Sequence, residues 1–364
     1  MNYKKILLAC AAITMTAATA PAQDDNLYAV EDTTAADTAT FIDGVYQNRI
    51  NPDASYRQPK AGILIIGSGP DIRVVSTFTG NASGGTAYSD AVNEYRRRLG
   101  DDVRIYSMVV PISSQYYTPD AARHLTYDQK AAIDGMYGRL EGVTPVDVYT
   151  PLGWHAREPI YLRTDHHWAP LGAYYAAEAF AKAAGVPFRD LSWYEPRTVH
   201  DFLGTMYRVY TKDPAVGRAP EDFVYYVPRD VDYYTTAITY QLGKNRQTTG
   251  ENPSKEVPFF REFKDGSGGA YSTFIGGDAN TTKVVTSTRN GRRLMIIKDS
   301  YGNAIPGYLF YSFEEIHILD FRYFPGNVVR YIRDNGITDL LFAHCISLAY
   351  STKNGQAIQR MLDR

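Results

Sequence analysis

Short apolar runs alternate with stretches of helical periodicity along most of this 364-residue chain. The apolar runs, such as 103–110 and 294–297, have the length and composition of buried strands. Between them, apolar side chains recur at helical spacing, and glycines such as Gly100 follow where helices are expected to end. Strands are expected at 62–67, 103–110, 145–149, 294–297, 316–319 and 337–345, and helices at 88–99, 126–140, 170–184, 302–311 and 328–335. This alternation predicts an α/β fold, a parallel sheet with helices on both faces.

Residues 200–290 interrupt the alternation. They contain tyrosine-rich, β-like runs at 223–227 and 233–240 and a polar, glycine-rich stretch at 241–269. We predict a β insertion with its own hairpins inside one domain that spans 45–364. The chain has 30 Tyr against 15 Phe. Such an excess fits half-buried strand positions, and it also fits a surface that stacks on sugars.

The first residues have the pattern of a secretory signal peptide. Lys4 and Lys5 precede a short apolar run at 6–13, and small residues lead to an A-x-A site at 20–22. The apolar run is too short to span a bilayer. The sequence therefore predicts export to the periplasm or the cell envelope. The predicted segments are a signal peptide at 1–22 and a flexible lead-in at 23–44.

Cysteine usage agrees with this prediction. Loss of 1–22 removes Cys10 and leaves Cys345, which stands in the apolar run 340–346. A lone cysteine forms no intramolecular disulfide, so the fold is expected to depend on its core, with Cys345 buried and inert. A lipoprotein signal at Cys10 is the less favoured alternative, because the apolar run continues beyond that residue.

Composition excludes two classes of protein. With 44% apolar residues, the chain has enough core-forming side chains to argue against disorder. The 38 basic residues are balanced by 40 acidic ones. Without a basic excess to neutralise phosphates, nucleic-acid binding is not expected.

A polar cluster follows the strand predicted at 294–297, where the sequence of 298–303 is Lys-Asp-Ser-Tyr-Gly-Asn. Ligands of such sheets bind beyond the carboxyl ends of the strands. A strand-to-helix turn exposes a hydroxyl there and aims N–H groups at a developing oxyanion. We therefore predict Ser300 as a nucleophile, with Gly302 and the Asn303 amide as oxyanion or substrate contacts. The alternative is that Ser300 only caps the next helix.

A second polar cluster, Asp165-His166-His167, precedes the helix expected at 170–184. Serine needs a base to take its proton, and histidine is suited to that task when a carboxylate fixes its tautomer. In an extended chain, Asp165 and His167 point to one side and His166 points away. With Ser300, the two clusters contain the parts of a Ser-His-Asp site.

Two alternatives compete for the second cluster. Asp165, His166, His167 and the nearby His155 are plausible metal ligands. Adjacent histidines on a strand face opposite ways, however, and the chain has no H-x-x-x-H motif. The second alternative is structural: the two histidines only form hydrogen bonds within the loop before a helix. Gly276-Gly277-Asp278 is expected to be a turn only.

The string Asp165-His166-His167-Trp168 resembles the signature of the DHHW protein family, which is named for it. Other segments resemble the same family, and the resemblance covers about residues 45–350. These segments are 106–111, 161–163, 171–175, 201–205, 297–303 and 322–324. DHHW proteins are in turn similar to the periplasmic alginate O-acetyltransferase proteins, whose fold is a variant of the SGNH hydrolase fold.

The resemblance implies a flavodoxin-like SGNH fold and a set of site residues. In the alginate proteins, an Asp-x-His pair and the Ser of a Gly-Asp-Ser turn form the triad, which implies Asp165, His167 and Ser300 here. His166 takes the x position and gains no role, and Lys298 replaces the glycine. Relatives often work beside a membrane-bound O-acyltransferase, so the resemblance implies such a partner as the source of acetyl groups.

These observations predict an exported O-acetyltransferase or acetylesterase that acts on a cell-envelope or secreted polysaccharide. The reaction is expected to pass through an acetyl-serine intermediate, with no cofactor or metal. Two alternatives stay open. One is a non-catalytic carbohydrate-binding or assembly factor with the same fold. The other is a metal-dependent hydrolase that uses Asp165, His166 and His167.

Overall fold

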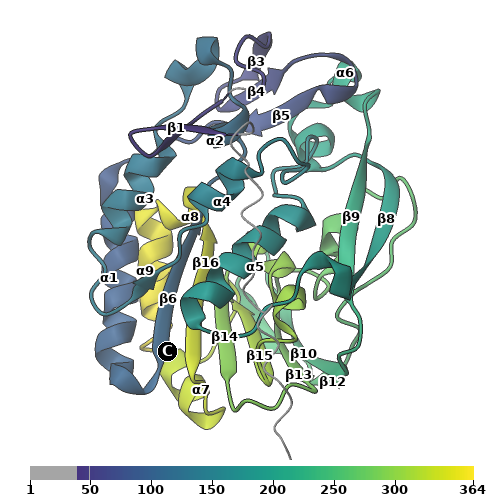
Figure 1. Cartoon of the computed structure of the whole chain (residues 1–364). Helices are drawn as coiled ribbons and strands as arrows, with labels where there is room; N and C mark the ends of the chain where they lie inside the picture. The colour runs from purple at the N-terminus through teal and green to yellow at the C-terminus, as the bar shows by residue number, and fades with distance from the viewer. Residues whose placement is uncertain (1–38, 49) are drawn as a thin grey trace, which may run out of the picture.

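The computed structural model of the chain describes residues 39–48 and 50–364 (Figure 1). The signal peptide predicted at 1–22 lies outside these residues, as does most of the lead-in predicted at 23–44. Within the lead-in, β1 (Thr40–Ile42) pairs with β2 (Val45–Gln47), so its last part is a strand and not a flexible segment. No helix in the described ranges has the length and apolar character needed to cross a membrane.

One large sheet organises the described residues, in the order β11-β10-β13-β15-β14-β16-β6-β7, with β12 paired to β10. The strands β15, β14, β16, β6 and β7 are parallel to one another. The central ones are buried along almost their whole length, as strands covered on both faces are. The strands are β6 (Arg104–Val110), β7 (Thr144–Pro145), β10 (Tyr233–Leu242), β11 (Thr248–Glu251), β12 (Lys255–Glu256), β13 (Asn280–Thr286), β14 (Arg293–Lys298), β15 (Glu315–Asp320) and β16 (Asp339–Cys345).

Helices cover both faces of this sheet, as predicted. On one face, Tyr95 of α1 packs edge-on against Phe342 of β16. On the other, Phe180 of α5 packs edge-on against Tyr106 of β6. Figure 1 shows α1 with α9 and α3 on one side of the parallel strands and α5 with α4 on the other. The helices are α1 (Ala82–Leu99), α2 (Ser114–Tyr117), α3 (Gln129–Tyr137), α4 (Tyr149–Trp154), α5 (Pro170–Ala184), α6 (Pro214–Gly217), α7 (Val328–Asp334), α8 (Ile346–Ala349) and α9 (Thr352–Arg360).

Local sequence signals explain where most helices begin and end. Pro170 opens α5, where its missing N–H costs nothing, and Gly185 closes it with φ 62°. The helix expected at 126–140 is shorter and is formed as α3. Asp128 is its cap, and the Gln129 side chain accepts a hydrogen bond from the Ile112 N–H.

The helix predicted at 302–311 is replaced by two 3₁₀ turns, η9 (Ser300–Ala304) and η10 (Pro306–Leu309). Pro306 has no N–H to continue a helix from the preceding turn. The other short turns are η3 (Gly69–Asp71), η4 (Gly100–Asp102), η5 (Asp120–Leu125), η6 (Leu191–Trp193), the π-helix η7 (Met206–Thr211) and η8 (Ala270–Thr273).

The insertion predicted at 200–290 is only partly a separate β unit. Its β9 (Glu221–Pro228) forms a hairpin with β8 (Tyr194–Phe202), away from the main sheet. Its other long strands join the main sheet: β13 pairs antiparallel with β15, and β10 pairs antiparallel with β13. The expectation of self-contained hairpins is therefore wrong there. The sheet is therefore mixed, not wholly parallel.

The buried strand predicted at 62–67 is present as β4 (Ile63–Ile66), but it belongs to a different sheet. It pairs antiparallel with β3 (Tyr56–Lys60) and β5 (Arg73–Ser76). Figure 1 shows these strands beyond the end of the main sheet where β16 leads into α8. This is the carboxyl edge of the parallel strands, where both polar clusters of the sequence lie.

Candidate active site

The turn after β14 presents Ser300 at the carboxyl edge of the sheet. Asp299 caps η9, because its carboxylate accepts the Tyr301 N–H at 2.9 Å. The other carboxylate oxygen accepts the Cys345 N–H at 2.8 Å and so ties the turn to the end of β16. Gly302 is needed here, since a Cβ on it would lie 2.5 Å from the Cβ of Lys298.

A tight loop before α5 presents the histidines. Tyr161 and Trp168 form an antiparallel bridge across it, and the Leu162 N–H donates to the His167 carbonyl at 3.3 Å. Trp168 is fully buried, and its Nε1–H donates to the Tyr301 carbonyl at 3.1 Å. The loop is thereby fastened directly to the Ser300 turn.

The structure brings Ser300, His167 and Asp165 into one hydrogen-bonded line. Ser300 Oγ lies 2.8 Å from His167 Nε2, across 133 residues of sequence. His167 Nδ1 lies 2.6 Å from Asp165 Oδ1. These separations are within the reach that a nucleophile, its base and the residue that orients the base require.

Asp165 is held by the loop after β8. Its Oδ2 accepts the Thr205 N–H at 2.6 Å and the Thr205 hydroxyl at 2.9 Å. Gly204 allows this approach, because a Cβ on it would lie 2.3 Å from the Asp165 Cβ. Burial raises the pKa of the Asp165 carboxyl, but the charge and hydrogen bond of His167, helped by His166 and Thr205, outweigh it. The pKa therefore lies below its usual range, and Asp165 is ionised near neutral pH.

Tyr271 forms one wall of the site. Its ring stacks on the His167 ring, with centroids 3.8 Å apart and planes 6° from parallel. Its hydroxyl donates to the Ser300 carbonyl at 3.1 Å and accepts the Trp168 Nε1–H at 3.1 Å. The stacked ring restricts rotation of the imidazole and covers one of its faces.

His166 does not point away from His167, contrary to the expectation for an extended chain. The loop bends, and the two imidazole centroids lie 3.8 Å apart. His166 Nδ1 lies 2.6 Å from the hydroxyl of Thr205. Burial, with the neighbouring His167, lowers the pKa of His166 to about 4, so its ring is neutral near neutral pH.

The same residues are the candidate metal ligands. One ligand atom each from Asp165, His166 and His167 can be chosen so that all lie within 4.8 Å of one another. Both Nδ1 atoms are, however, hydrogen-bonded to protein oxygens, and His167 Nε2 faces Ser300. His155 is separate from this group and pairs with Glu158 at 2.6 Å.

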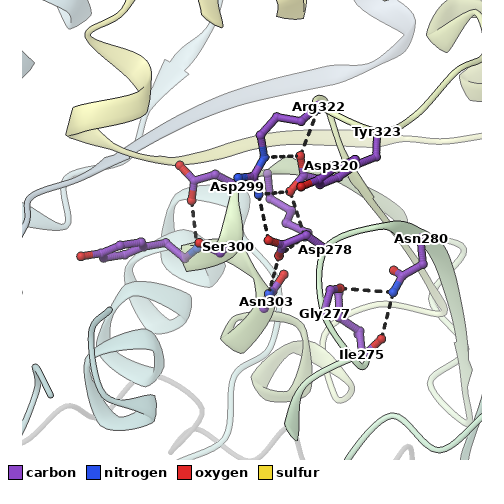
Figure 2. A network of polar contacts seen from close by, with 12 residues as sticks. Ile275, Gly277, Asp278, Asn280, Asp299, Ser300, Asn303, Asp320, Arg322 and Tyr323 are labelled. Carbon is purple, nitrogen blue, oxygen red and sulfur yellow. Dashed lines mark hydrogen bonds and ion pairs between the residues drawn. The ribbon is translucent and has the colours of Figure 1, made fainter. Parts of the chain in front are cut away.

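A network of ion pairs borders the Ser300 turn (Figure 2). We call it the ion-pair cluster; it consists of Asp278, Lys298, Asn303, Asp320 and Arg322. Lys298 is fully buried, and its Nζ lies 3.3 Å from a carboxylate oxygen of each aspartate. Arg322 donates to the same two aspartates, at 3.0 Å to Asp278 and 2.6 Å to Asp320. The two positive and two negative groups neutralise one another, which permits a buried lysine where the resemblance leads one to expect glycine.

The predicted oxyanion contacts are only partly available. The Gly302 N–H already donates to the Asp299 carbonyl at 3.0 Å. The Asn303 amide donates one hydrogen to Asp278 at 2.8 Å and keeps its second. No described residue accepts a hydrogen bond from the Ser300 N–H. In this geometry, the donors available for an oxyanion are the Ser300 N–H and the second Asn303 hydrogen.

Some residues of the site were not predicted from the sequence as site residues, among them Gly204, Thr205, Tyr271 and Asp278. Gly204 and Thr205 lie in a segment that resembled the family, but without an implied role. Asp278 was expected only as part of a turn, and it does follow the positive-φ residues Gly276 and Gly277. Tyr271 has no local signal in the sequence.

Comparisons with known proteins find a family and several solved structures that are similar to this chain. A family model described as "DHHW protein" matches residues 75–319. The crystal structure of a DHHW family protein from Eubacterium siraeum is 36% identical, covers 85% of this chain and 98% of its own, and has a TM-score of 0.75. Bacillus cereus PatB1 with a sulfonyl adduct is 16% identical, with 83% and 96% covered and a TM-score of 0.60. The O-acetyltransferase domain of Pseudomonas putida AlgJ is 12% identical, with 85% and 99% covered and a TM-score of 0.42.

A comparison with curated protein sequences finds no match. The likeness to PatB1 in fold, together with the mixed α/β sheet and its helices, confirms the predicted SGNH hydrolase-like fold. The family model spans more than half of the chain, and the E. siraeum protein is similar over nearly its whole length. The chain therefore belongs to the DHHW protein family.

Proposed function

We propose that this protein is an exported O-acetyltransferase or acetylesterase that acts on a cell-envelope or secreted polysaccharide through an acetyl-serine at Ser300. The observation that carries the proposal is the unbroken line from Ser300 Oγ to His167 at 2.8 Å and from His167 to Asp165 at 2.6 Å. A serine that only capped a helix would not require a histidine and a carboxylate aligned with its hydroxyl.

The first half of the reaction uses His167 as a general base. His167 Nε2 takes the proton of Ser300 Oγ, which bonds to the acetyl carbon of a donor ester. Asp165 stabilises the imidazolium that forms, and the stacked ring of Tyr271 holds the imidazole of His167 in its orientation. The imidazolium then returns the proton to the leaving oxygen of the donor, and acetyl remains on Ser300.

The tetrahedral intermediate needs hydrogen-bond donors for its oxyanion. We assign this role to the Ser300 N–H and the free Asn303 hydrogen, which Asp278 orients by accepting the other hydrogen of the same Nδ2 group. Gly302 contributes through its lack of a side chain, not through its N–H.

The similar proteins support the class of reaction. The PatB1 structure is described with a sulfonyl adduct, the kind of product that an activated nucleophile gives with a sulfonylating reagent. The polysaccharide substrate and a membrane-bound O-acyltransferase as acetyl source come from the family resemblance. Export is proposed from the signal pattern at 1–22.

Turnover of p-nitrophenyl acetate by residues 23–364 tests the proposal. Ser300→Ala, His167→Ala and Asp165→Asn are each expected to lose on the order of 10³-fold or more in kcat, as members of a triad do. The matched control is His200→Ala, because His200 also pairs with a carboxylate, Asp222 at 2.9 Å, but on the exposed surface. It is expected to match the wild type.

Two outcomes would favour the other functions. Turnover that survives Ser300→Ala but is lost after treatment with a chelator would favour a metal-dependent hydrolase. Specific glycan binding with no turnover in any variant would favour the carbohydrate-binding or assembly factor.

A further inference from the structure

His166 is the exposed member of its cluster. Its side chain is 38% accessible to solvent, whereas the side chains of His167 and Asp165 are 8% and 2% accessible. The mechanism proposed above gives it no task, although its ring lies 3.8 Å from that of His167. A half-exposed imidazole beside the base is well placed to contact whatever approaches Ser300.

The contacts of Thr205 fix the tautomer of His166. Asp165 is ionised and can only accept hydrogen bonds, so the single hydroxyl hydrogen of Thr205 is donated to Asp165 Oδ2. The Thr205 oxygen must then accept from His166 Nδ1, which lies 2.6 Å away. His166 is therefore protonated at Nδ1 and carries a lone pair at Nε2. No described residue hydrogen-bonds to that Nε2.

The ion-pair cluster is partly accessible to solvent, as His166 is. The charges of Asp278 and Arg322 both act on the His166 ring, in opposite senses. Asp278 and Arg322 are 24% and 31% accessible, and Asp278 contacts Asn303, close to Ser300 (Figure 2). An acceptor molecule must reach Ser300 from solvent, and His166 is the more accessible of the two imidazoles there.

We propose that His166 Nε2 is a binding group for the acetyl acceptor, and that it selects a vicinal diol, the arrangement found on sugar rings. One hydroxyl of the diol attacks the acetyl group, and its neighbour donates a hydrogen bond to His166. The inference rests on the proposed acetyl-serine chemistry and adds to it the reason why a carbohydrate is preferred to water.

The transfer step is balanced. The attacking oxygen of the diol bonds to the acetyl carbon while its proton passes to His167 Nε2. The bond from that carbon to Ser300 Oγ then breaks, and Oγ recovers the proton from His167. His166 takes no proton; it accepts a hydrogen bond from the second hydroxyl throughout. Water has no second hydroxyl to place there.

The test compares two small acceptors in the presence of p-nitrophenyl acetate. Ethylene glycol has a second hydroxyl that can donate, whereas in 2-methoxyethanol a methyl group blocks it. The amount of each acetate ester is measured by gas chromatography. After correction for the two equivalent hydroxyls of ethylene glycol, the wild type is expected to favour it by about fivefold, roughly the effect of one hydrogen bond.

Three variants locate the preference. His166→Phe keeps a ring against His167 but has no nitrogen, and it is expected to lose the preference. His166→Gln places an amide oxygen near the position of Nε2 and is expected to restore part of it. The control is His124→Phe on exposed η5, which is expected to keep the full preference.

Intact-mass measurement of acetyl-Ser300 on the same samples separates the possible failures. Absence of both acetyl-Ser300 and turnover of p-nitrophenyl acetate in the wild type would refute the proposed function itself. Acetyl-Ser300 without a preference for ethylene glycol, or with the same preference in His166→Phe, would overturn only the role of His166. ¹⁵N spectra of histidine-labelled protein give a check independent of activity, since a His166 protonated at Nε2 would also overturn it.

Discussion

At His167, two neighbours define one protonation pattern. The ionised carboxylate of Asp165 requires a hydrogen on Nδ1, and this leaves the lone pair of Nε2 for the Ser300 hydroxyl. The Thr205 hydroxyl, which donates to Asp165, in turn accepts from His166 Nδ1 and leaves His166 with its lone pair at Nε2. The two adjacent histidines thus present lone pairs for different tasks, one as base and one as binding group.

Tyr271→Phe separates two contributions of the tyrosine. The variant keeps the ring that stacks on His167 but loses the hydroxyl that contacts Ser300 and Trp168. Because Trp168 retains the Tyr301 carbonyl as a partner, we expect a loss of about threefold to tenfold in kcat, the effect of one hydrogen bond. Esterase kinetics with p-nitrophenyl acetate measure it. A loss as large as that of His167→Ala would contradict a supporting role and assign chemistry to the hydroxyl.

At the scale of elements, the site depends on two short segments fastened together. The Ser300 turn is tied to β16 through Asp299, and the histidine loop is tied to the turn through Trp168. The sequence predicted both segments from residue types next to apolar runs. It did not predict the bend that brings the rings of His166 and His167 together, because nothing local distinguishes this loop from an extended one.

Asp299, in the Ser300 turn, makes the free energy of unfolding depend on pH. Burial raises the pKa of Asp299 to about 6, although Arg322 and the Tyr301 and Cys345 N–H groups lower it in part. The folded state thus holds this proton more tightly than the unfolded state. Stability from this group is fully present below the unfolded pKa near 4 and is lost as pH rises through about 6.

Urea unfolding of the wild type and Asp299→Asn tests this dependence. The wild type is expected to lose about 2–3 kcal/mol relative to the variant between about pH 4 and pH 7, from the size of the shift. The comparison between the two proteins cancels the carboxylates whose pKa values are lowered, such as Asp165 and Asp278, which act at lower pH. A difference in stability that does not change with pH would show that Asp299 is equally ionised in both states.

At the scale of the whole molecule, the antiparallel half of the sheet is the part that sequence reasoning missed. In the chain, β14 lies between β13 and β15, and only long-range pairing shows that β13 and β10 extend the sheet beyond β15. The tyrosine excess is also explained at this scale. Many of the tyrosines, including Tyr88, Tyr95 and Tyr116, are buried core residues and do not form a sugar-stacking surface.

An ion pair at the opposite edge of the sheet is expected to contribute to the free energy of unfolding without affecting esterase activity. Arg292, before β14, contacts the buried Asp339 of β16 at 2.6 and 2.8 Å. Asp339→Ala leaves Arg292 without its partner and is expected to cost about 3–5 kcal/mol in unfolding free energy. Esterase activity well below the melting temperature is expected to stay at the wild-type level. A loss of kcat in folded protein would show that this edge is coupled to Ser300.

The most direct test of the account is to label the nucleophile. Residues 23–364 are incubated with a serine-reactive fluorophosphonate, and the product is examined by intact-mass spectrometry and peptide mapping. Ser300→Ala and His167→Ala are treated in parallel. The account predicts one adduct, on Ser300, that is absent from both variants. An adduct on another serine, or no adduct while the protein is folded, would contradict the claim that His167 and Asp165 activate Ser300.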